Sequence, residues 1–143
     1  MANTSAICNS FKTQILKAEH NFTASTGSTF TLALYDSDAT LGAGTTAYNS
    51  AEEITGTGYT AGGKNLTSVT PVLDSSTAVC DFGDISWTSA TFTANACLIY
   101  RSSGTGNPSV CSVAFGGDKS VSSGTFTIQF PAAAATTAIV RIA

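Results

Sequence analysis

The chain has 143 residues, the size of a single domain, and carries a net charge of −3, with only 10% of its residues charged against roughly 25% in an average globular protein. Its six Lys and Arg residues are scattered along the chain, which excludes the clustered basic surface that nucleic acid requires. No run of eighteen apolar residues occurs, so no membrane-spanning helix is expected. Thr and Ser make up roughly 30% of the chain, and Thr favours β-strands. No signal peptide is visible, so we expect the protein to remain in the cytoplasm where it is made.

The first element in chain order is an amphipathic helix predicted over residues 5–20. Ile7, Phe11 and Ile15 recur on one stripe at the helical period of 3.6 residues. We expect this stripe to be docked, either on the chain's own β-domain or on a neighbouring subunit, and the pattern does not choose between them. His20, the only histidine, is expected to be solvated at the helix end, next to the helix dipole.

A strand is predicted over residues 29–36, where every second residue is apolar. Residues 37–63 follow as a long connection rich in Gly, Thr, Ser and Ala. Such long connections are uncommon in compact domains and are usually functional. We interpret this one as a surface excursion that is held down by its two tyrosines, Tyr48 and Tyr59.

The central strand is predicted over residues 91–101. Its first half alternates apolar and polar residues, and from Cys97 onward both faces are apolar, which is typical of a strand that becomes covered on both sides. Before it, residues 64–74 form a predicted strand in which Pro71 indicates a sheet edge or a bulge. A hairpin then leads into a strand at residues 76–82.

After the central strand, residues 109–115 are expected to return antiparallel to it. A turn is predicted at Gly116–Lys119, followed by strands at 125–130 and 136–142. Seven or eight short strands at this spacing predict an all-β fold, a single β-sandwich or jelly-roll-like domain with one N-terminal helix.

We divide the chain into residues 1–24, the helix and its connection, and residues 25–143, the β-sandwich domain. Two segments have the residue types of chemical sites. Gly58–Lys64 has the spacing of a phosphate-binding loop, but a predicted strand follows where a helix is needed. Asp36–Asp38 starts like a calcium loop but lacks its later ligands, so an Asx-turn is favoured and a loose surface Ca²⁺ site is the alternative. We therefore predict no catalytic residue, metal or cofactor, and no enzyme.

The four cysteines have no metal-ligand spacing. They are interpreted as buried free thiols, with a Cys97–Cys111 disulfide as the alternative in an oxidising compartment. Trp87, together with Tyr48 and Tyr59, either forms a platform on which a sugar stacks or fills the core.

Four stretches, residues 7–12, 31–36, 56–63 and 124–131, resemble a family of small tailed-bacteriophage proteins over nearly the whole chain. The family is similar in kind to head decoration (cement) proteins. This resemblance implies a structural virion protein on the capsid surface, synthesised in the host bacterial cytoplasm, that does no chemistry. Its partners would be the major capsid protein and copies of itself in a homotrimer, without nucleic acid or membrane.

The residues expected to make these contacts are Ile7, Phe11, Ile15, Tyr48 and Tyr59. The alternative function is a tail, neck or fibre component that binds host glycans through exposed aromatic side chains. A secreted carbohydrate-binding module is a third hypothesis, which the missing signal peptide disfavours.

Overall fold

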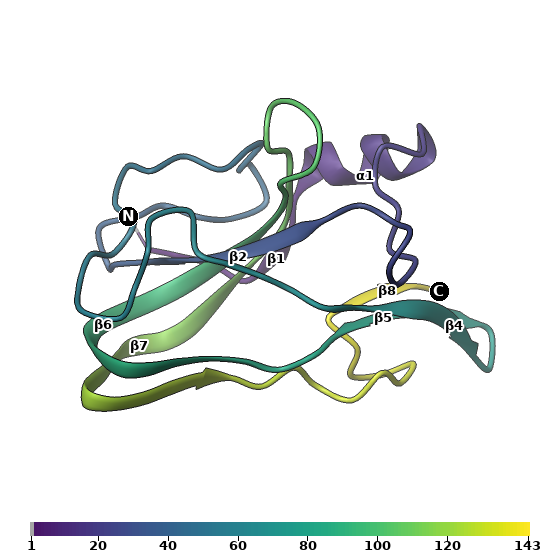
Figure 1. The fold of residues 1–143 in the computed structure, drawn as a ribbon. Helices are drawn as coiled ribbons and strands as arrows, with labels where there is room; N and C mark the ends of the chain where they lie inside the picture. Colours follow the sequence, from purple (N-terminus) through teal and green to yellow (C-terminus); the bar gives the residue numbers. More distant parts are fainter. Residues whose placement is uncertain (1) are drawn as a thin grey trace.

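The computed structural model describes residues 2–143, and these residues form two antiparallel β-sheets packed together, with one helix (Figure 1). The larger sheet has five strands in the order β1-β7-β6-β2-β3, and the smaller has three in the order β4-β5-β8. The predicted all-β sandwich with one helix is confirmed. The elements are β1 (Ala6–Ile7), α1 (Asn9–Leu16), β2 (Phe30–Tyr35), β3 (Lys64–Asn65), β4 (Ser68–Asp74), β5 (Thr77–Phe82), β6 (Ile85–Arg101), β7 (Ser109–Ile128) and β8 (Val140–Ile142).

Strand β6 lies between β7 and β2 in the larger sheet, as predicted for the central strand, and it begins at Ile85 rather than at Thr91. The alternation of β6 is interrupted by a register shift between Ala94 and Ala96. Ala94 shares the core between the sheets with Cys97, whereas Ala96 lies in the second apolar cluster. A β-bulge therefore exchanges the two faces of the strand at this point.

The second apolar cluster explains why both faces of β6 are apolar after the bulge. It contains residues of β2 and β6, and residues of the excursion at 37–63 cover it from outside; its buried members are Ala33, Tyr35, Ala39, Leu41, Ala96, Leu98 and Tyr100. The two middle strands are thus covered on one side by the core cluster, to which α1 and the smaller sheet contribute, and on the other side by the excursion.

The turn predicted at Gly116–Lys119 is wrong, because β7 continues through it to Ile128. Between two paired positions of β6, Ala96 and Ala94, strand β7 advances from Ala114 to Lys119. The extra residues form a bulge in which the two adjacent glycines adopt positive φ angles. The strand predicted at 125–130 is accordingly the end of β7 and not a separate element.

The predicted helix over residues 5–20 is also too long, because α1 covers only Asn9–Leu16. Ala6 and Ile7 pair instead with Ser112 and Cys111 of β7. This pairing, with a strand more than one hundred residues away, gives hydrogen-bond partners to the backbone groups of Ala6 and Ile7. In the predicted helix these groups would have bonded within an additional helical turn. Among residues 2–143, no helix has the length and apolar character to cross a membrane.

The strand predicted over residues 64–74 is divided into β3 and β4, which belong to different sheets. Strand β4 is the edge of the smaller sheet, and its pairing with β5 shifts between Val69 and Val72, on either side of Pro71. The proline therefore marks both the edge and the bulge, as expected for a residue without an N–H group.

Candidate contact sites

The excursion at residues 37–63 is fastened by one carboxylate, Glu53. The hydroxyls of Tyr48 and Tyr59 each donate to it at 2.6 Å, and the Gly62 N–H donates at 2.7 Å. We call Tyr48, Glu53, Tyr59 and Gly62 the tyrosine latch. The prediction that the two tyrosines hold the excursion is confirmed, although Glu53, which joins them, was not singled out.

The tyrosine latch is also tied to the larger sheet. The Leu34 N–H of β2 donates to the Tyr59 hydroxyl at 2.9 Å, and the Tyr100 hydroxyl of β6 donates to the Gly62 carbonyl at 2.7 Å. Burial, and then the hydrogen bond to Glu53, raise the pKa of the Tyr48 and Tyr59 hydroxyls well above the ordinary value. Both phenols therefore remain protonated donors over the physiological pH range.

Trp87 does not form a sugar-stacking platform. Its side chain is 4% exposed and packs against Tyr59, Phe92 and Phe126. Tyr48 is half-buried and stacks on Tyr100, with their ring centroids 4.7 Å apart. The interpretation of Trp87 as a core residue is confirmed, and a glycan platform made of these three side chains is absent from this structure.

The glycines of the phosphate-loop-like segment shape a turn. Gly58, Gly62 and Gly63 have positive φ angles, and the following Lys64 and Asn65 form β3 rather than a helix. A Cβ atom on Gly63 would overlap the carbonyl of Leu32. The absence of a side chain lets this turn lie against β2.

The Asx-turn predicted at Asp36–Asp38 is confirmed, since the Asp38 N–H donates to the Asp36 carboxylate at 2.9 Å. Carboxylate oxygens of Asp36, Asp38 and Glu52 lie within 4.8 Å of one another. Asp38 and Glu52 are exposed, so water can solvate their charges. A surface Ca²⁺ site at these carboxylates stays the untested alternative to the predicted absence of a metal.

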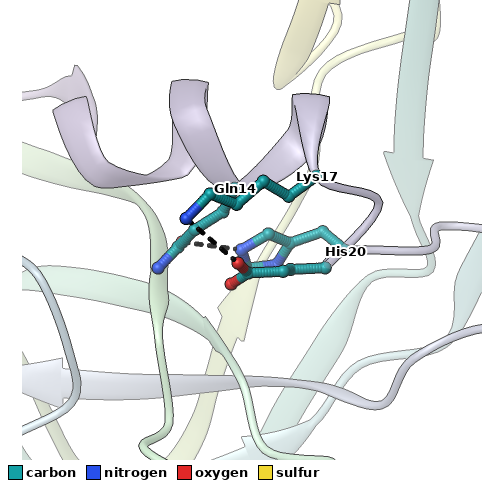
Figure 2. Close-up of polar contacts among 4 residues, drawn as sticks. Gln14, Lys17 and His20 are labelled. Carbon is teal, nitrogen blue, oxygen red and sulfur yellow. Dashed lines mark hydrogen bonds and ion pairs between the residues drawn. The ribbon is translucent and has the colours of Figure 1, made fainter.

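His20 is buried, so the prediction that it is solvated at the helix end is wrong. It is 4% exposed instead of solvated, with its ring stacked on Phe22 and Phe30 and in edge contact with Phe11. Figure 2 shows it beneath α1, where its Nε2 lies 2.9 Å from Oε1 of Gln14. Burial, followed by the positive charge of Arg101, lowers its pKa to about 4, against a smaller opposing effect of Glu19. The ring is therefore neutral at pH 7.

All four cysteines are free thiols, so the alternative Cys97–Cys111 disulfide is not formed. Cys8, Cys97 and Cys111 are buried and Cys80 is half-buried. Burial raises the pKa of Cys97 to about 12 and that of Cys80 to about 11. The thiolate, which is the reactive form, is accordingly scarce at neutral pH.

We expect iodoacetamide at pH 7.5 to label at most one thiol, Cys80, in the folded protein, and all four after denaturation in guanidinium. Mass spectrometry of intact protein counts the added groups, and the denatured sample is the control. Rapid labelling of Cys97 or Cys111 before denaturation would contradict the burial described here.

An apolar groove lies between α1 and the smaller sheet. Figure 1 shows that α1 and the smaller sheet lie at the same end of the molecule. Its volume is about 410 Å³. Strand pairing places Leu73, Ala78 and Ile142 in one row across the smaller sheet, and Leu73 and Ile142 are 72% and 57% exposed. We call Leu73, Ala78, Ile142 and, from α1, Ile15 the apolar rim. The groove is lined by Phe11, Ile15, Ala18, His20, Asn21, Phe22, Thr23, Pro71, Ala78, Cys80, Val140 and Ile142.

The five predicted contact residues divide between the rim and the interior. Ile15 belongs to the apolar rim, Ile7 is half-buried in β1, and Phe11 is 3% exposed in the core. Tyr48 and Tyr59 are the donors of the tyrosine latch. Leu73 and Ile142 were not singled out, because their common row depends on the pairing of β4, β5 and β8, which local alternation does not reveal.

The fold and these surfaces define a β-sandwich with a single short helix, a latched excursion and an exposed apolar rim. No protein-family model, curated protein or solved structure matches this chain.

Proposed function

We propose that the chain is a structural subunit of a tailed-bacteriophage virion, a capsid decoration (cement) protein that stabilises the head. The observation that supports this most is the apolar rim. The chain has few charged residues, and at the rim it exposes large apolar side chains beside an open groove. Contiguous exposed apolar surface of this kind marks interfaces between proteins.

Other features of the chain suit a rigid assembly subunit. Thr and Ser supply much of the polar surface, and the excursion is fixed to the sheets by the tyrosine latch. Interfaces that bind without rearranging retain more of their contact energy, since less conformational entropy is lost. The major capsid protein and further copies of the chain are the proposed partners, on the virion surface.

We expect the double substitution of Leu73→Asp and Ile142→Asp to reduce the copies bound per phage head by at least about tenfold. Two charges would then have to be desolvated at a contact that is apolar in the native protein. The measurement is quantitative mass spectrometry of purified particles, after adding protein to heads that lack it. The free energy of unfolding should change by less than about 1 kcal/mol, because both side chains are mostly exposed.

The control is Val72→Asp, which adds one negative charge to β4, the strand that contains Leu73. Val72 pairs with Val79, whereas Leu73 pairs with Ala78, so Val72 lies on the opposite face of the smaller sheet. We expect this variant to bind heads like the native protein. Binding of the double variant at the native level, or a particle image that places the protein on the tail, would contradict the proposal.

A further inference from the structure

The last part of β7 is a free strand edge. Beyond Ser112, where the pairing with β1 ends, no strand among residues 2–143 pairs with the side of β7 that faces away from β6. Figure 1 shows this part of the strand, in yellow-green, along the outer margin of the larger sheet. The backbone N–H and C=O groups on that side therefore lack a strand partner in the described chain, and such groups pair readily with another extended segment.

The other sheet edges are short or blocked. Strands β1 and β3 have two residues each and β8 has three, and β4 contains Pro71 and a bulge. Within β7, the last inserted residue lies between Val121 and Gly124, so the strand continues without a bulge of its own from there to its end. We call Gly124–Ile128 the β7 edge. It has about the length of an average strand.

The sequence of the β7 edge is complementary to itself. Residues 120–130 contain no charged residue and no proline. Two copies of the edge can meet antiparallel around a two-fold axis at Thr127, which places Phe126 of each copy opposite Ile128 of the other and Thr127 opposite Thr127. Apolar side chains then meet on one face of the joined sheet and hydroxyls meet on the other, and no like charges are brought together.

A hollow beside the β7 edge would receive the apolar side chains of the second strand. Its volume is about 400 Å³, and it is lined by Phe115, Lys119, Phe126, Thr127 and Ile128. Phe115, Phe126 and Ile128 are only half-buried, so the core is incompletely covered here. When a strand adds to a sheet, its backbone hydrogen bonds supply affinity and pockets beside the edge supply specificity. The free edge and the pocket occur at the same place in this chain.

We propose that two copies of the chain pair through the β7 edge, antiparallel about Thr127, so that β7 of each copy extends the larger sheet of the other. This contact goes beyond the proposed function, because it needs no capsid protein. It joins chains in pairs and does not by itself build the trimer that the family resemblance implies. Its small area places it among the weak interfaces, so pairing should depend on protein concentration.

Sedimentation equilibrium of the purified full chain tests the pairing. Between about 10 µM and about 1 mM, the range in which small interfaces associate, the measured mass should rise from the 14.5 kDa of one chain toward twice that value. Thr127→Lys should weaken the pairing at least about tenfold, because two lysines would meet at the axis. Thr88→Lys is the control, since Thr88 is exposed on β6 and lies away from the edge. A native protein that stays monomeric at about 1 mM would overturn the proposal.

An exchange of charges tests the two-fold register itself. Thr127→Lys and Thr127→Glu should each be monomeric alone, whereas their equimolar mixture should pair, because Lys then faces Glu. Both variants should unfold at the native urea midpoint, since Thr127 is exposed. A mixture of folded variants that stays monomeric would contradict the register. Without any variant, amide hydrogen exchange within Gly124–Ile128 should slow as the concentration of native protein rises.

The two proposals fail in different experiments. Pairing is measured on purified protein, whereas the Leu73→Asp and Ile142→Asp variant is measured on heads. Loss of pairing in Thr127→Lys with native head binding would support the β7 contact and leave the capsid function unaffected. A native protein that is monomeric, together with reduced head binding by Thr127→Lys, would mean that another protein occupies the edge, and would overturn pairing between copies.

Discussion

Replacing Glu53 by alanine is expected to lower the free energy of unfolding by about 3 kcal/mol. Three donors, the hydroxyls of Tyr48 and Tyr59 and the N–H of Gly62, share this carboxylate at 2.6 to 2.7 Å. Hydrogen bonds to a charged group contribute about 1.5–3 kcal/mol each, but three that share one half-buried acceptor are not additive, so we expect about 3 kcal/mol for the set. For a domain of this size the melting temperature should fall by roughly 10 °C.

Chemical denaturation and amide hydrogen exchange can test this expectation together. The Gly62 amide should exchange faster in Glu53→Ala, because its acceptor is gone. Glu53→Gln keeps one acceptor oxygen and should lose less stability than Glu53→Ala. Glu52→Ala is the matched control, since the neighbouring carboxylate is exposed and lies near Asp36 and Asp38. An unfolding midpoint in Glu53→Ala equal to that of the control would refute the latch.

The elements that could be predicted from the sequence are those fixed by nearby residues. The alternation in 91–101 locates β6, and Pro71 locates the bulged edge of β4. The excursion contains only two aromatic residues in a segment rich in Gly and Thr, so Tyr48 and Tyr59 were its natural anchors. In each case the chemistry of a few consecutive residues determines the structure.

The errors occurred where a distant partner decides the outcome. Gly116-Gly117 can form a turn or a bulge, and only the pairing of β7 with both halves of β6 selects the bulge. Ala6–Ile7 fits a helical stripe, but Cys111 and Ser112 offer it a strand to join. The apolar rim is also non-local, because its row joins the β4–β5 hairpin to β8, more than fifty residues later in the chain.

His20 is the clearest case of a non-local effect. A polar residue after a helix is usually solvated, and the sequence around it does not predict burial. The chain adopts a left-handed conformation at Ala18, and the following segment packs under α1. There the ring joins an aromatic cluster with Phe11, Phe22 and Phe30. The phenylalanines that bury it come from three different segments, so no local pattern could have indicated the cluster.

This burial makes the stability of the protein depend on pH. The pKa of His20 is about 4 in the folded chain and about 6.5 in the unfolded chain. As pH falls below 6.5, the unfolded state binds the proton first, so the folded state loses stability progressively until pH approaches 4. Between pH 7 and pH 4.5 we expect a loss of about 2 kcal/mol from this group alone.

Urea denaturation of the native protein and of His20→Phe, at pH 7 and at pH 4.5, isolates this contribution. Carboxylates also titrate in this range, but they are common to both proteins, so their effect cancels when the two pH dependences are subtracted. The charged groups that act on the ring, Glu19 and Arg101, are likewise unchanged in the variant. The native protein should lose about 2 kcal/mol more than His20→Phe on acidification. Equal losses in the two proteins would mean that His20 takes up its proton in the folded chain as readily as in the unfolded chain, and that the aromatic cluster does not exclude the imidazolium.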